Sequence, residues 1–94
     1  MVTFTRVTHK HHGYHQGFKC FYQYRKSEQW ADPVYWIRRI LKETYGDSHA
    51  FTVKNGYTFN GHWLDDRKRH RIYFMHEADT TMILLKLSMN QTLT

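Results

Sequence analysis

The chain has 94 residues, a net charge of +6 at pH 7, 17% aromatic residues and a single cysteine. This length suits one domain, one cysteine excludes an intramolecular disulfide, and no run approaches the roughly 20 apolar residues of a membrane-spanning helix. We therefore expect a single domain over residues 1–94 in a reducing compartment. That compartment is the cytoplasm, or the host cytoplasm if the protein is encoded by a phage.

The N-terminal part of the chain predicts a β-hairpin. Residues 2–8 and 18–25 both alternate apolar and polar side chains, and a loop over residues 9–16 separates them. If either strand lies at a sheet edge, it could extend the sheet into a homodimer. The second strand gathers an apolar face in which the cysteine is expected to be an inert core residue: Phe18, Cys20, Tyr22 and Tyr24.

One helix is predicted next, over about residues 33–45. Asp32 is a good N-cap, and Pro33 suits the first helical position because its missing N–H has no partner there. Gly46 supplies the left-handed residue that commonly ends a helix. Arg38 and Arg39 lie off the apolar stripe and are expected at the surface. The stripe itself has the spacing of one helix face: Val34, Ile37, Ile40, Leu41 and Tyr45.

The remainder of the chain predicts an antiparallel meander. Its first turn is interpreted as a three-residue loop ending at Gly56, because this register pairs Val53 with Tyr57 and Phe51 with Phe59. All four apolar residues then share one face, whereas a two-residue turn would divide them between two faces. The fourth strand could continue into the fifth through Gly61.

A two-residue turn at Ala78-Asp79 is predicted to join the last two strands. It would create three cross-strand pairs: Phe74 with Ile83, Ile72 with Leu85, and His70 with Leu87. The face that carries Phe74 and Ile72 is strongly apolar and should receive the helix. The predicted fold is therefore α+β, an antiparallel sheet of about five or six strands with the single helix packed on one face.

The opposite face of this meander is the predicted binding surface. Cations bind phosphates and aromatic rings stack on bases, so the expected partner is nucleic acid or an acidic protein surface. The alternative is a solvated face whose arginines pair with Asp65, Asp66 and Glu77. Six residues would form the surface, the last two at its rim: Arg69, Arg71, Tyr73, Lys86, Arg67 and Lys68.

Aromatic residues around the helix offer a second candidate surface. Trp36, with Arg38 and Arg39 beside it, would suit a protein interface, because Trp, Tyr and Arg are enriched at interface hot spots. The alternative is structural: Trp30 packs over the helix start and Trp36 borders the core.

Residues 62–88 also resemble the meander of RelE-like endoribonuclease toxins. The resemblance consists of the basic strand 69–74, a tight turn and a hydrophobic strand. It implies metal-free RNA cleavage by His70, Arg71 and Tyr73. The start of the chain departs from the toxin pattern, because a hairpin and one helix replace a strand and a helical pair. The chain has no Gly-rich phosphate loop, nucleophile elbow or zinc-protease helix motif.

Neither a metal site nor another cofactor is expected. The histidine-rich loop has no neighbouring carboxylate, although it holds His9, His11, His12 and His15. We expect a small basic non-enzymatic protein that binds nucleic acid or an acidic surface of a nucleic-acid-handling complex, such as a phage accessory or inhibitor protein. The alternatives are the metal-free ribonuclease and an inhibitor that binds protein alone through exposed aromatic residues.

Overall fold

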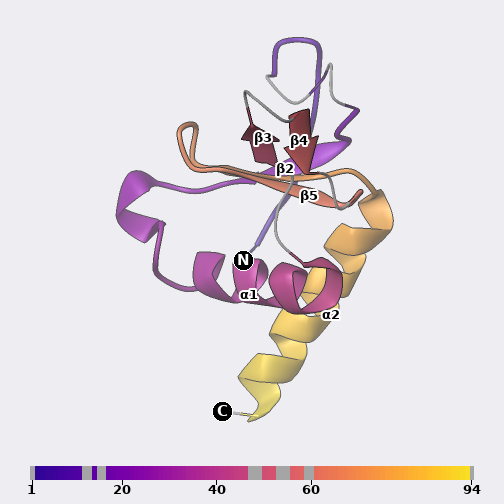
Figure 1. The fold of residues 1–94 in the computed structure, drawn as a ribbon. Coiled ribbons are helices and arrows are strands. Elements are labelled where there is room, and N and C mark those ends of the chain that lie inside the picture. Colours follow the sequence, from indigo (N-terminus) through magenta and orange to yellow (C-terminus); the bar gives the residue numbers. More distant parts are fainter. Residues whose placement is uncertain are drawn as a thin grey trace.

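The fold is α+β, with a four-stranded antiparallel main sheet, a small two-stranded sheet and two α-helices (Figure 1). The computed structural model describes residues 2–11, 14, 17–46, 50–52, 56–58 and 61–93, with side chains given outside 50–58 and 90–93. The elements follow in the order β1 (Thr5–Arg6), β2 (Cys20–Gln23), the 3-10 helix η2 (Lys26–Glu28), α1 (Val34–Tyr45), β3 (Ala50–Thr52), β4 (Gly56–Thr58), β5 (Trp63–Asp66), β6 (Arg71–Phe74) and α2 (Glu77–Leu93).

The main sheet has four strands in the order β1-β2-β6-β5. The predicted N-terminal hairpin is confirmed, because Arg6 in β1 pairs with Cys20 in β2. However, β2 is hydrogen-bonded on both sides, so the strand predicted at 18–25 cannot extend the sheet into a dimer. The edges of the sheet are β1, which has only two residues, and β5.

Strands β3 and β4 form a separate two-stranded sheet rather than part of the main one. In their register Phe51 pairs with Tyr57, so the predicted pairings of Val53 with Tyr57 and of Phe51 with Phe59 are both wrong. Residues 53–55 and 59 lie outside the described residues. The fourth strand does not continue into the fifth either. Gly61 has a φ angle of 84°, a left-handed conformation that interrupts an extended strand.

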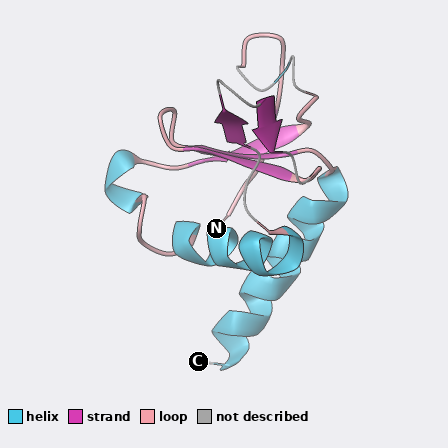
Figure 2. Cartoon of the chain, viewed as in Figure 1, coloured by secondary structure: helices cyan, strands magenta, loops and turns pink. Residues whose placement is uncertain are grey.

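The C-terminal segment is a helix, and the strand predicted there is wrong (Figure 2). Glu77 and Asp79 lie in the first turn of α2, where carboxylates favour the positive end of the helix dipole. Asp79, Ile83 and Leu87 are buried at a spacing of four, which is one helical face. The predicted pairs of β6 with residues 83–87 therefore do not exist. Its neighbours are β2 and β5.

Helix α1 forms as predicted, apart from its first residues. It begins at Val34, directly after Pro33, and no side-chain cap from Asp32 is made. Gly46 has a φ angle of 87° and ends the helix, and its N–H donates to the Lys42 carbonyl. The buried positions include the predicted Val34, together with Ile37, Ile40 and Leu41. Arg38 is buried as well, contrary to the prediction that it lies at the surface.

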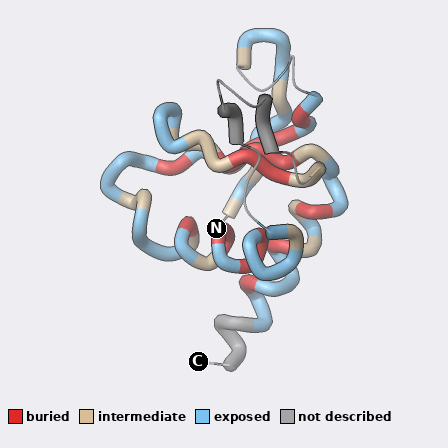
Figure 3. Tube along the Cα trace, viewed as in Figure 1, coloured by how far each residue is buried: buried red, intermediate tan, exposed pale blue. Residues whose placement is uncertain are grey.

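The larger core lies between the sheet and the two helices (Figure 3). Ile72 and Phe74 of β6 are fully buried there against Ile37 and Leu41 of α1 and Ile83 of α2. The prediction that the Ile72/Phe74 face receives the first helix is therefore confirmed.

The opposite face of the sheet is apolar and buried too. Phe21 and Tyr73 are partners across β2 and β6, so their side chains point to this face. They form a second core cluster with Leu64 and with Phe18, which the alternating pattern had grouped with Cys20 instead. The predicted open, mixed face is therefore wrong, because these four apolar side chains are buried together on it.

Cys20 is buried in the larger core, as predicted, and burial raises the pKa of its thiol to about 11. Only the thiolate reacts with disulfide reagents. We expect native protein at pH 8 to react with Ellman's reagent about 100-fold more slowly than protein unfolded in urea. Equal rates in the two states would contradict the burial of this side chain.

Candidate nucleic-acid interface

The basic run forms the turn between β5 and β6. Asp66 pairs with Arg71, and residues 67–70 connect them. The Asp66 carboxylate accepts a hydrogen bond from the Arg69 backbone N–H at 3.2 Å, a bond that favours Asp at the start of turns. His70 has a φ angle of 58°, in the left-handed region where histidine is enriched. Arg69 therefore projects from a turn instead of lying on a sheet face, as had been predicted.

Gln23 of β2 holds this turn in place. Its side-chain amide donates hydrogen bonds to the carbonyls of Arg69 and His70 at 3.1 and 3.0 Å. Its side-chain oxygen accepts a bond from Nε of Arg71 at 2.9 Å. The Tyr24 backbone N–H also donates to the His70 carbonyl at 3.0 Å. These bonds fix both the backbone of the turn and the Arg71 guanidinium relative to the centre of the sheet.

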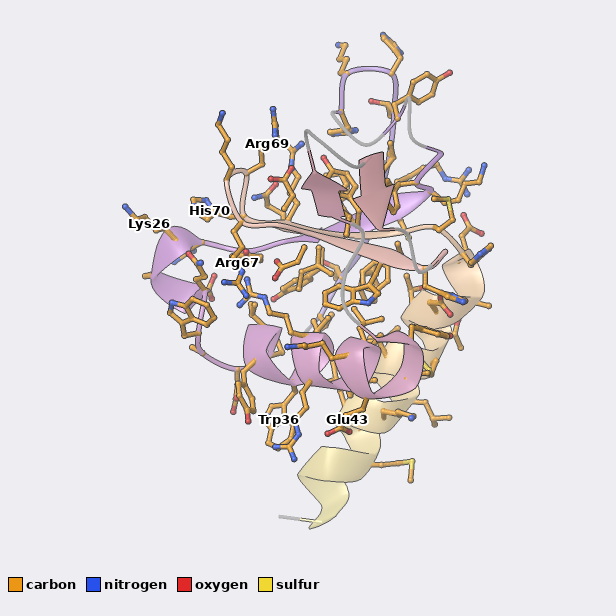
Figure 4. All side chains as sticks on the ribbon, in the orientation of Figure 1. Lys26, Trp36, Glu43, Arg67, Arg69 and His70 are labelled. Carbon is orange, nitrogen blue, oxygen red and sulfur yellow. The ribbon has the colours of Figure 1, made fainter. Side chains whose placement is uncertain are left out.

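Basic side chains from two segments meet at this end of the sheet (Figure 4). The β5–β6 turn and the start of β6 carry one group. The second group lies between β2 and η2 and at the first residue of η2. We name the set the basic hairpin surface: Arg25, Lys26, Arg67, Lys68, Arg69, His70 and Arg71.

The carboxylates at this surface are much less accessible than the cations. The Asp65 and Asp66 side chains are 9% exposed, whereas those of Arg67 and Arg69 are 54% and 39% exposed. A ligand that approaches from solvent therefore meets mainly positive charge. Lys68 is exposed as well.

The alternative prediction, that arginines of this surface form ion pairs with the protein's own carboxylates, is correct for two residues. Arg67 lies 3.0 Å from Asp65, and Arg69 lies 3.3 Å from Asp66, whereas Glu77 pairs with Arg6. The guanidinium groups of Arg67 and Arg69 are themselves exposed, so a phosphate can reach N–H groups that face solvent. Lys26 and Lys68 have no carboxylate partner within the part of the chain that the structure describes.

Arg38 does not belong to this surface, although it was a candidate. It is 7% exposed, and its guanidinium donates to the Tyr24 hydroxyl at 2.7 Å and to the Gln29 carbonyl. Its Nε lies 3.0 Å from the Asp65 carboxylate. Arg38 therefore ties α1 to Tyr24 just after β2, to β5 and to the segment after η2.

Trp30 is a further residue whose position differs from the structural alternative stated for it. It was expected to pack over the helix start, but it is 65% exposed. Its ring centroid lies 4.7 Å from the guanidinium carbon of Arg67 and 5.1 Å from that of Arg38. Arg25 and Lys26 are close in sequence to Trp30, and this proximity of cations to an aromatic residue could have indicated an exposed binding residue before the helix.

Two other candidates, Tyr73 and Lys86, are not part of the basic hairpin surface. Tyr73 is fully buried, and its hydroxyl accepts a hydrogen bond from Arg71 at 3.0 Å. Lys86 is on α2, which leaves the sheet at the end of β6 farther from the turn (Figure 1). The last strand in the resemblance to RelE-like toxins is α2, so the two arrangements differ there.

Trp36 and Arg39 lie on a different surface, the side of α1 away from the sheet (Figure 4). The Arg39 guanidinium carbon is 5.6 Å from the Trp36 ring centroid, and Arg39 pairs with Glu43 at 2.9 Å. Trp36 is half-buried and borders the larger core, as its structural alternative predicted. These two residues cannot act together with the basic hairpin surface on one small ligand.

A second polar cluster surrounds Asp79, which was predicted to lie in a turn. Its buried carboxylate accepts a hydrogen bond from the Tyr45 hydroxyl at 2.5 Å and lies 3.0 Å from Nδ1 of His62. The bond to Asp79 raises the pKa of Tyr45 to about 12. The His62 ring stacks on Tyr45 with centroids 3.6 Å apart. This cluster joins α1 to the start of α2.

The described residues contain no group of three or more His, Cys, Asp or Glu placed to hold a metal ion. His12 and His15 of the predicted loop lie outside them. In the same part of the chain, no helix is long and apolar enough to cross a membrane. Searches against family models, curated proteins and solved structures find no match, so the function must be argued from the residues of this chain.

Proposed function

We propose that this is a small non-enzymatic protein that binds nucleic acid through the basic hairpin surface. The observation that carries the proposal is the concentration of exposed cations on a turn whose backbone is fixed by Gln23. Most of the affinity of nucleic-acid-binding proteins comes from such cations, because they neutralise phosphates and release bound counterions.

A fixed turn also favours nucleic acid over a flexible acidic protein segment. Arg67, Lys68 and Arg69 are consecutive, so the turn presents several cations at close spacing, which suits the regular row of phosphates along a strand. Arginine can also bind one phosphate through two N–H groups. An acidic surface of a nucleic-acid-handling protein would offer the same charge without that regular spacing. It is the second candidate ligand.

The proposal predicts a strong salt dependence. We expect affinity for labelled DNA and RNA, measured by fluorescence anisotropy, to fall steeply between about 50 and 200 mM salt. Lys68→Ala and Lys26→Ala should each reduce the slope of log affinity against log salt by about 0.7–0.9, because each removes one phosphate contact. Both side chains lack a carboxylate partner among the described residues, so neither change breaks an ion pair seen there.

Lys86→Ala is the matched control, since it removes the same charge from the exposed side of α2. Its slope should equal that of the unchanged protein. Salt-insensitive binding, or an equal effect of all three substitutions, would contradict the proposed surface. If an acidic peptide binds to the surface and nucleic acid does not, the partner is an acidic protein. RNA cleavage that is lost in Arg71→Ala would support the ribonuclease alternative.

A further inference from the structure

We infer that Trp30 is a stacking platform for an unpaired base, and that single-stranded nucleic acid is therefore the preferred ligand of the basic hairpin surface. This inference rests on the proposed function and adds the class of nucleic acid. The Trp30 ring lies at the protein surface, with two arginines beside it.

Most of the Trp30 side chain remains accessible to solvent. Arg38 and Arg67 each place Nε 3.0 Å from the same oxygen, Oδ2 of Asp65. Their guanidinium carbons are 5.1 and 4.7 Å from the ring centroid. Two groups held so close to one atom cannot lie on directly opposite sides of the ring at these distances. They therefore flank the ring without enclosing it, which agrees with its 65% exposure.

The surroundings of the ring are ordered before any ligand binds. Arg38 donates to the carbonyl of Gln29, the residue directly before Trp30, and is itself held by Tyr24 and Asp65. A side chain that is already positioned loses little conformational freedom on binding, and this increases affinity. The two guanidinium groups also make cation–π interactions with the indole ring, and these interactions restrict its orientation.

The chemistry of the platform selects single strands. Bases in a duplex are paired and stacked on one another, so a surface tryptophan cannot reach their faces. In a single strand each base can stack on an aromatic ring, and cations beside the ring hold the flanking phosphates. Arg67 contacts the Trp30 ring, and Lys26 precedes Trp30 by four residues, at the start of η2. We therefore infer that both side chains bind such phosphates.

The test compares two labelled single strands of equal length, a thymidine oligomer and an abasic oligomer with the same phosphates. We expect the unchanged protein to prefer the thymidine oligomer by about 5- to 150-fold, the range of one stacked base. Trp30→Ala should bring the two affinities together. It should leave affinity for the abasic oligomer within about twofold, because the phosphate contacts remain.

Trp36→Ala is the control and should keep the full preference, since Trp36 lies on another surface. Trp30→Phe should keep part of it. As a second measurement, the thymidine oligomer should quench tryptophan fluorescence in a Trp36→Phe protein, and the abasic oligomer should not. The other remaining tryptophan, Trp63, is only 2% exposed, so quenching by the oligomer reports on Trp30. This readout needs no substitution at Trp30, so misfolding of Trp30→Ala cannot obscure the result.

The outcomes separate the two proposals. If the protein binds both oligomers with the same salt dependence and no preference, or if Trp30→Ala keeps the preference, the stacking inference is wrong and the proposed function stands. A higher affinity for duplex than for the thymidine oligomer also overturns the inference. If neither oligomer nor duplex binds at low salt, the proposed function fails and the inference fails with it.

Discussion

Replacing Arg38 with alanine is expected to destabilise the protein by about 3–5 kcal/mol, the range for removing one partner of a buried ion pair. The loss is large because the pair is sequestered: the side chains of Arg38 and Asp65 are only 8% and 9% exposed. Without Arg38, the Asp65 carboxylate keeps Arg67 as its one neighbouring cation among the described residues.

Two further features of this network increase the effect. Oδ1 of Asp65 has no hydrogen-bond partner among the described residues, so Asp65 has little to compensate for a lost cation. Arg38 also satisfies the Tyr24 hydroxyl and the Gln29 carbonyl. Alanine would leave both without this donor.

The measurement is urea unfolding followed by circular dichroism. Arg39→Ala is the matched control, because the neighbouring Arg39–Glu43 pair is exposed to solvent and its loss should change stability little. The double substitution Arg38→Ala with Asp65→Ala should cost less than the sum of the two single changes, since it removes both charges. A loss below about 1 kcal/mol for Arg38→Ala would show that this ion pair is not buried in solution.

Phe74→Ala is expected to cost about 3–5 kcal/mol as a truncation in the core. Phe74 is fully buried in the core between the sheet and the helices, and Phe4 packs edge-on against it with ring centroids 5.2 Å apart. Both neighbouring strands, β2 and β5, place partners beside it, namely Cys20 and Trp63. The surrounding chain is held from several sides and cannot collapse fully into the cavity.

Urea unfolding tests this prediction with two comparisons. Phe74→Leu keeps more of the volume and should lose less stability. Leu85→Ala truncates a large apolar side chain that is 63% exposed on α2, and should change stability by no more than about 0.5 kcal/mol. If Phe74→Ala also cost less than about 1 kcal/mol, the assignment of this sheet face to the core would be wrong.

The Arg38 network joins stability to the candidate site. The same guanidinium that compensates Asp65 also flanks the Trp30 ring. Substitution of Arg38 would therefore change folding and binding together. Lys26 and Lys68 are better probes of binding, because they are exposed and make no ion pair with Arg38 or Asp65 among the described residues.

The amino-acid sequence determined the elements whose patterns are local. The apolar spacing from Val34 to Leu41 and the left-handed Gly46 specify α1, because one helix face and one helix end need only neighbouring residues. Alternation in residues 18–25 and 71–74 likewise predicted β2 and β6. The cation-rich segment 67–71 was predicted as the main candidate for a binding surface, and it forms the β5–β6 turn and the start of β6.

The tertiary structure decided what depends on distant partners. The apolar run 82–85 suits a strand or a helix, and the burial of Asp79, Ile83 and Leu87 on one helical face selected the helix. Tyr73 is buried because it packs with Phe18, Phe21 and Leu64, which come from other segments of the chain. Arg38 is buried because Asp65, far along the chain, supplies the opposite charge. Trp30 stays at the surface beside that pair, because charges and packing between distant segments, which no local pattern records, set its place.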